Sequence, residues 1–262
     1  MSFDLKLHAY RLLMDEPFFA ALSRKIEKRA STDIPTAGVR VCPDTAQFEM
    51  IYNPDFFDSL PEEQVRGVLK HEFYHLIFEH VTSRKPEGVT HQLWNVCADL
   101  AINSHLVGEL PDNCCMPGVG PFADLPKGES AEWYLAKLIE QGKTKKEAGE
   151  GEDGEGEPGE GSGEGEGSGE GESFDDHSGW SDDGDSPAQQ AANQMAKERL
   201  KQGMKEAAKE ASQSPKGWGT VSGAVKKEII KRLETKVDWR KVMRYFIKTS
   251  QRASRRSSVK RI

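Results

Sequence analysis

The sequence predicts an α+β fold that is mainly helical and contains a small β-sheet. Apolar residues recur at helical spacing over residues 4–30 and again over residues 61–84. Between these runs, residues 37–42 and 47–52 each have the composition of a short strand, and Pro43-Asp44 between them is a turn signal. Two strands flanked by helices predict one α+β domain.

The helix predicted at residues 4–30 has one apolar face, and only Pro17 in it predicts a break or a kink. We expect this helix to serve as scaffold. The residues of its apolar face are Leu5, Ala9, Leu12, Leu13, Phe18, Phe19, Leu22 and Ile26.

The helix predicted at residues 61–84 carries a complete His-Glu-x-x-His motif, His71-Glu72-Phe73-Tyr74-His75. A four-residue spacing returns to the same helix face one turn later, so the two imidazoles can bind one tetrahedral Zn²⁺. Glu72 then lies beside the metal, where it can take a proton from the attacking water and pass it to the leaving amine of a peptide bond. The alternative is a pair of core histidines that bind no metal.

The third metal ligand is predicted on the next helix, residues 94–103. Asn95, Asp99 and Asn103 lie at i, i+4 and i+8 and form one polar stripe. Apolar neighbours turn Asp99 towards the interior, where a carboxylate is costly unless it meets a cation such as zinc. The alternative is an Asp99 that is satisfied by Arg84 or by backbone donors.

The predicted site therefore has three ligands and several supporting side chains. His71, His75 and Asp99 bind the metal, and this ligand set suits zinc. His80 lies about 180° from His71 around a straight helix, so it cannot bind the same metal unless the helix ends after Glu79. The side chains that we expect to support the ligands from behind are Asn95, Asn103, His80 and Arg84.

These residues resemble the putative metallopeptidase domain family of bacteria and phages, whose domain commonly precedes a von Willebrand factor A-like domain. The resemblance rests on the His71 to His75 motif followed by His80 and Arg84, and on Trp-Asn-Val-Cys-Ala-Asp-Leu-Ala-Ile-Asn at residues 94–103. It implies a zincin-like metallopeptidase fold, metal-dependent peptide hydrolysis and, by association, a MoxR-type AAA+ ATPase as a partner.

Two stretches near the end, residues 237–240 and Arg255-Arg256, resemble the family's segment that leads into the A-like domain. The sequence stops at Ile262, which leaves no length for that domain. We therefore expect either a short form or a fragment of a longer protein.

Other residues near the expected site carry weaker predictions. In a zincin-like fold the strand edge that faces the cleft binds an extended peptide, so the strand at residues 47–52 is a candidate docking site. A plain structural hairpin explains this strand equally well. Tyr134, on a short helix predicted at residues 130–139, and His91 are candidates to polarise the scissile carbonyl, although core or surface roles are more common.

Composition divides the chain into a domain at residues 1–142, a linker at residues 143–187 and a C-terminal module at residues 188–262. From residue 147 to residue 185 there are 16 acidic residues and no Lys or Arg, with Gly or Ser at most other positions. Such a segment cannot bury enough apolar surface to offset the entropy of ordering it. We therefore expect an acidic, disordered linker.

The C-terminal module is predicted to be helical and basic. Residues 216–262 contain 15 Lys or Arg and 3 acidic residues, a net charge of 15 − 3 = +12 in a chain of net charge −7. Three interpretations remain open: contact with nucleic acid or another anionic partner, binding of the acidic linker to the basic helix, and docking of a helix whose basic sides are solvated. Trp239, Phe246 and Ile247 favour docking against the catalytic domain.

We expect neither a targeting signal nor a membrane span. The N-terminus has no basic region followed by an apolar core, and no apolar run approaches membrane-spanning length. The four cysteines show no paired zinc spacing, and four free thiols suit a reducing compartment. These features predict a cytoplasmic protein without a membrane partner.

We predict that the chain hydrolyses a peptide or protein substrate, with zinc as the metal and Glu72 as general base and acid. The alternative is a non-catalytic module in which the metal provides stability and the basic C-terminal helix binds an AAA+ ATPase or nucleic acid. Glu72 favours the enzyme, because a structural zinc site does not need a general base beside its ligands.

Overall fold

The computed structural model describes Leu5, His8 and residues 14–42, 44–82, 85–86, 88–142 and 187–234. Arg84, nearly all of the predicted linker and the residues after Glu234, among them Trp239, Phe246, Ile247, Arg255 and Arg256, lie outside the described residues. The chain divides into two units, Met1–Ser222 and Gly223–Ile262. The described part of the second unit holds α8 (Gly223–Glu234), a helix in which Val225 and Ile229 are buried.

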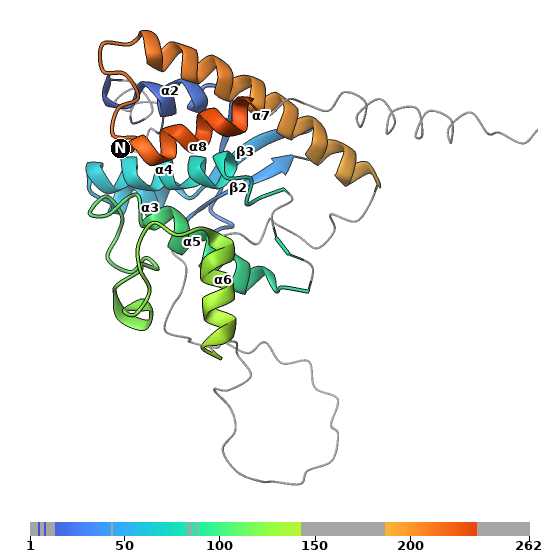
Figure 1. The fold of residues 1–262 in the computed structure, drawn as a ribbon. Helices are drawn as coiled ribbons and strands as arrows, with labels where there is room; N and C mark the ends of the chain where they lie inside the picture. The colour runs from blue at the N-terminus through green and yellow to red at the C-terminus, as the bar shows by residue number, and fades with distance from the viewer. Residues whose placement is uncertain are drawn as a thin grey trace, which may run out of the picture. The chain divides into compact units, whose positions relative to one another are not determined.

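The fold class is α+β, as predicted, because the described residues form helices and one three-stranded sheet (Figure 1). Within the part of the chain that is described, no helix combines the length and the apolar character needed to cross a bilayer. The elements of the first unit are α2 (Pro17–Ser23), β1 (Glu27–Ala30), β2 (Ala37–Cys42), β3 (Gln47–Tyr52), α3 (Pro54–Ser59), α4 (Glu62–Ile77), α5 (His91–Asn103), η1 (Gly120–Phe122), α6 (Ala131–Glu140) and α7 (Pro187–Gln213).

The three strands have the order β1-β3-β2, so β3 lies in the centre of the sheet. β2 and β3 have the bounds predicted from the sequence and pair antiparallel, with Val39 opposite Met50. β1 pairs parallel with β3, with Lys28 opposite Met50. Because β3 is paired on both sides, it offers no edge to a peptide, and the prediction of substrate docking on this strand is wrong.

β1 lies where the apolar spacing predicts a continuous helix over residues 4–30, so that prediction is wrong beyond Ser23. α2 begins with Pro17, whose missing N–H costs nothing in a first turn, and it ends in tight turns closed by the N–H groups of Lys25 and Ile26. Parallel pairing with β3 then satisfies the backbone groups of β1 on the side that faces β3. Local periodicity cannot reveal a partner that lies so far along the chain.

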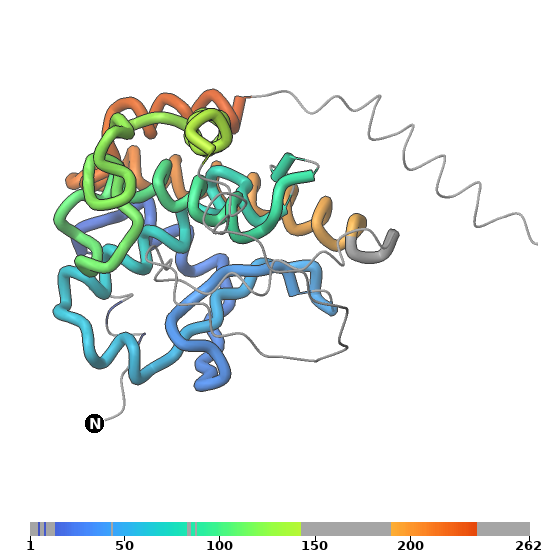
Figure 2. Tube along the Cα trace, turned by 90° about the horizontal axis from the view of Figure 1, so that it is seen from below, coloured from blue at the N-terminus to red at the C-terminus, as the bar shows by residue number. Residues whose placement is uncertain are grey.

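The helices of the first unit pack against the sheet and against one another. α4 contacts β2, α7 contacts β2, β3 and α2, and α5 contacts both α4 and α6. In Figure 1, α7 runs alongside α2. Figure 2 shows the Cα trace of the same chain from below. The largest fully buried side chains come from most of these elements and include Phe18, Phe19, Met50, Phe57, Phe73, Trp94 and Tyr134.

The helix that follows the predicted linker, α7, belongs to the first unit. Ion pairs join Arg24 to Glu210 at 2.6 Å and Lys25 to Glu206 at 2.7 Å. Composition suggests boundaries near residues 142 and 188, whereas the contacts divide the chain after Ser222. The buried residues of the apolar face of α7 are Ala192, Ala196, Leu200, Met204, Ala207 and Ala211.

Candidate metal centre

The motif helix α4 is buried along most of its length. It follows Pro61, and Glu62 and Glu63 in its first turn interact favourably with the positive end of the helix dipole. Every residue from Gly67 to Ile77 is buried. The His-Glu-x-x-His motif therefore lies on a buried helix.

The second ligand-bearing helix, α5, begins at a side-chain cap. Thr90 Oγ1 accepts a hydrogen bond from the N–H of Leu93 at 3.3 Å, which satisfies one of the unpaired donors of the first turn. One turn separates Asp99 from Asn103, and both side chains are fully buried. α5 therefore presents a carboxylate and an amide on one interior face.

His71, His75 and Asp99 converge on one point inside the first unit. The two Nε2 atoms are 2.9 Å apart, and Asp99 Oδ1 lies 3.7 Å from His71 Nε2 and 3.3 Å from His75 Nε2. Ligand atoms held about 2.0–2.1 Å from a tetrahedral zinc ion lie about 3.3 Å from one another. The three distances bracket this value. Among the described residues this is the one such group of His, Cys, Asp or Glu, and its ligand atoms lie within 4.8 Å of one another.

Asn103 holds the first ligand from behind. Its Oδ1 lies 2.7 Å from His71 Nδ1, and its Nδ2 donates to the carbonyl of Cys115 at 2.7 Å. Since an amide oxygen can only accept, the proton of His71 is on Nδ1, and Nε2 presents its lone pair towards the other two ligands. This tautomer is the one that a metal requires.

His80 reaches the site because α4 ends in a tight C-terminal turn. The N–H of Glu79 donates to the Leu76 carbonyl at 3.0 Å, and the N–H of His80 donates to the His75 carbonyl at 2.9 Å. Glu79 takes the left-handed conformation that this turn needs, with φ 61°. The chain thus turns back, and His80 Nδ1 comes within 3.3 Å of His75 Nδ1. α4 thus ends at Ile77, two residues before the end that the sequence condition for His80 required.

The remaining predicted site residues differ in their placement. Glu72 follows His71 on α4 and is fully buried. Asn95 is half-buried on α5, one turn before Asp99. Arg84 lies outside the described residues.

The candidates for polarising a carbonyl do not join this group. Tyr134 lies in an apolar cluster, where its hydroxyl donates to the Pro126 carbonyl at 2.6 Å and burial raises its pKa. His91 is the first residue of α5, two turns before Asp99. Tyr134 therefore has the core role that the sequence left open.

The thiol of Cys97, on α5, stays neutral at physiological pH. Burial, and then the Asp99 carboxylate, raise its pKa to about 12.

Three residues behind the ligands were missed by the sequence analysis. The Cys115 carbonyl orients Asn103, and no sequence pattern announces such a contact. A Cβ on Gly67 would lie 1.8 Å from the Glu109 carbonyl oxygen, so α4 and the chain after α5 touch there. Lys70 is buried beside His71. A glycine inside a helix, one turn before a ligand, was the available signal.

Comparison with known proteins agrees with this geometry. A family model described as "Putative metallopeptidase domain" matches residues 2–261. No curated protein and no solved structure matches the chain. The family match spans both helices that supply the ligands, as well as α7 and the residues beyond it. The chain therefore belongs to the putative metallopeptidase domain family.

Proposed function

We propose that this protein is a zinc-dependent peptidase in which His71, His75 and Asp99 bind the metal and Glu72 is the general base. The convergence of the three ligand atoms within 4.8 Å carries the proposal. Membership of the family supports metal-dependent proteolysis in general. The choice of zinc rests on the donors, because two imidazoles and one carboxylate at tetrahedral spacing suit this ion.

The side chains have distinct roles in the proposed reaction. A bound zinc ion would lower the pKa of water and polarise the scissile carbonyl. Glu72 accepts a proton from the attacking water and delivers it to the nitrogen of the leaving amine. Asn103 keeps the Nδ1 proton of His71 in place, so that Nε2 faces the metal. Three protein ligands leave a fourth tetrahedral position open, which is typical of catalytic zinc sites.

A second candidate is a non-catalytic module in which the metal stabilises the fold. The complete burial of His71, Glu72, His75 and Asp99 favours this candidate, because a substrate must reach the reacting atoms. An AAA+ ATPase or a nucleic acid would then bind the basic residues after Glu234, which lie outside the described residues.

Metal analysis combined with a cleavage assay separates the two candidates. We expect about one zinc per chain in the wild type and in Glu72→Gln, and no bound zinc in His71→Ala or Asp99→Ala. The wild type should cleave members of a mixed library of fluorescence-quenched peptides, and Glu72→Gln should not. Zinc binding without any cleavage would leave the second candidate. A wild type that binds no zinc, even when zinc is added, would overturn both.

A further inference from the structure

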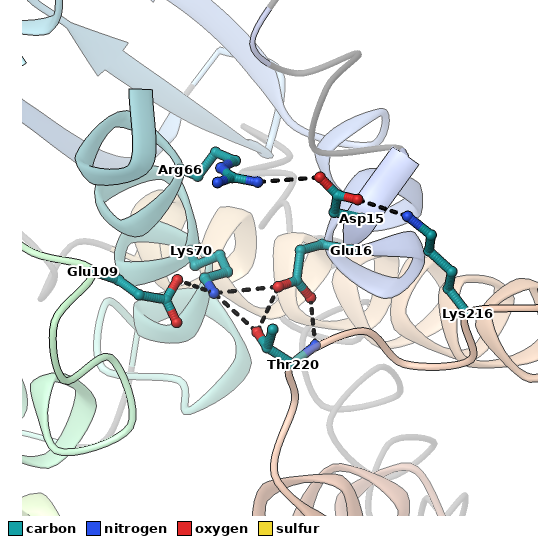
Figure 3. Close-up of polar contacts among 7 residues, drawn as sticks. All are labelled: Asp15, Glu16, Arg66, Lys70, Glu109, Lys216 and Thr220. Carbon is teal, nitrogen blue, oxygen red and sulfur yellow. Dashed lines mark hydrogen bonds and ion pairs between the residues drawn. The ribbon is translucent and has the colours of Figure 1, made fainter. Parts of the chain in front are cut away.

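The first unit contains a charged cluster built around Lys70, the residue that precedes the first ligand. Lys70 is buried, and its ammonium forms ion pairs with Glu109 and with Glu16, whose Oε1 is 3.4 Å away (Figure 3). A third partner, Thr220 Oγ1, lies 3.0 Å from Nζ. Glu109 is partly exposed, whereas Glu16 is buried together with Lys70, and a buried carboxylate is costly unless donors meet both of its oxygens.

Thr220, in the segment after α7, supplies these donors. Its N–H donates to Glu16 Oε2 at 2.9 Å, and its hydroxyl donates to Glu16 Oε1 at 2.5 Å (Figure 3). The same hydroxyl accepts from Lys70. One threonine therefore satisfies both oxygens of the buried Glu16 carboxylate and one donor of the buried ammonium.

The segment of residues 216–220, with the sequence Lys-Gly-Trp-Gly-Thr, packs closely against Phe18 and Glu16. The ring of Trp218 stacks on Phe18 with centroids 4.6 Å apart and an interplanar angle of 14°. Gly219 has φ +66°, and a Cβ on it would lie 2.1 Å from Glu16 Oε2 and 2.8 Å from the backbone oxygen of Asp15, so this position requires glycine. The stacked indole and the two-oxygen contact hold the segment in one register.

The cluster is joined to both helices that supply metal ligands. Lys70 immediately precedes His71 in the sequence of α4. Its partner Glu109 follows α5, which carries Asp99, and the Glu109 carbonyl also touches Gly67 one turn before His71. The ion pair and the glycine contact therefore set the position of α4 against the end of α5. Sites of this kind need their side chains held within about 0.5 Å of the working geometry.

We propose that residues 218–220 are a positioning element of the metal centre. They hold Lys70 through Glu16 and Thr220, and Lys70 holds the turn of α4 that bears His71. The inference rests on the proposed metal site and goes beyond it. It makes metal binding depend on residues that come after the acidic segment in the sequence.

Zinc affinity of the full chain tests this proposal with a matched set of variants. Thr220→Val removes the hydroxyl and keeps the shape, while Thr220→Ser keeps the hydroxyl. Lys216→Ala removes an exposed ion pair with Asp15 in the same segment and does not touch Lys70. The metal-free proteins are titrated with zinc against a chromophoric chelator, and circular dichroism at the same temperature verifies that each variant is folded.

We expect Thr220→Val to bind zinc about tenfold more weakly, near the low end for partners behind the ligands, and Thr220→Ser and Lys216→Ala to stay within about twofold of the wild type. A folded Thr220→Val with wild-type affinity overturns the proposal, even if its unfolding temperature falls. If Thr220→Val does not fold, Thr220→Ala is read by the same criterion. Absence of zinc binding by the wild type would instead be the failure of the proposed function.

Discussion

Asn103 Oδ1 accepts a hydrogen bond of 2.7 Å from Nδ1 of His71. The orientation of the amide is set from outside both ligand helices, because its Nδ2 donates to the carbonyl of Cys115. A backbone carbonyl thus determines which nitrogen of the first ligand carries the proton. The loop after α5 is for this reason part of the candidate metal site.

Replacing Asn103 by Leu should weaken zinc binding while largely keeping the side-chain volume. His71 loses its acceptor and the buried Cys115 carbonyl loses its donor, so the imidazole is no longer held in one tautomer. We expect the zinc affinity to fall by about 10–100-fold in a chelator competition assay. Asn113→Ala, an exposed change in the same connection, is the control and should bind zinc like the wild type. Equal affinities for Asn103→Leu and the wild type would disprove the role of Asn103.

Two helical glycines predict opposite responses to alanine. Gly67→Ala places a Cβ 1.8 Å from the Glu109 carbonyl oxygen, a backbone atom that cannot move without shifting the chain after α5. Gly203→Ala on α7 meets only the flexible stem of Lys25, at 3.3 Å. By urea denaturation, Gly67→Ala should lose about 3 kcal/mol or more of unfolding free energy. Gly203→Ala should change it little or raise it by up to about 1 kcal/mol. A well-folded Gly67→Ala would show that the close approach is absent.

The turn that brings His80 back to His75 carries local strain at Glu79. A non-glycine residue at φ 61° costs about 1 kcal/mol, whereas glycine takes this conformation freely. Glu79 also pairs with Lys197 at 2.9 Å, but the pair is partly exposed and therefore weak.

Glu79→Gly should consequently be more stable than Glu79→Ala by about 1 kcal/mol, since both lose the ion pair and only Ala keeps the strain. Urea denaturation of the two variants, compared directly, measures this difference. Equal stabilities would mean that the turn is not strained.

The helical part of the site was accessible from sequence because it depends on local geometry. A spacing of four residues determines that His71 and His75 share a face, and the same spacing aligns Asp99 with Asn103. Burial of a carboxylate then predicts a cationic partner. The α+β class and the bounds of β2 and β3 followed in the same way from local pattern.

The parts that sequence did not reveal depend on contacts between distant segments. β1 consists of Glu-Lys-Arg-Ala, which has no strand-like alternation. It forms a strand because one edge of β3 is available to pair with it. The Lys-Gly-Trp-Gly-Thr stretch at residues 216–220 has the composition of a loop, and only packing against Phe18 and Glu16 shows its purpose. α7 belongs to the first unit through its contacts with α2 and the sheet, and composition does not show such contacts.

Lys28 predicts a rise of stability at alkaline pH. Burial lowers its pKa from 10.5 to about 8 in the folded state, while in the unfolded chain it stays near 10.5. Below about pH 8 the folded protein holds a disfavoured buried ammonium. Between pH 8 and 10.5 the unfolded chain binds more protons than the folded protein, so the free energy of unfolding rises with pH. The total rise is no more than about 3 kcal/mol. The neutral amine still donates to the carbonyls of Ser23 and Ile26, at 2.5 and 2.9 Å. Relative to Lys28→Met, the wild type should therefore gain unfolding free energy from pH 7.5 to pH 10 in urea denaturation, with a constant difference between pH 6 and pH 7. A difference that is also constant up to pH 10 would show that Lys28 is not held in a desolvated place.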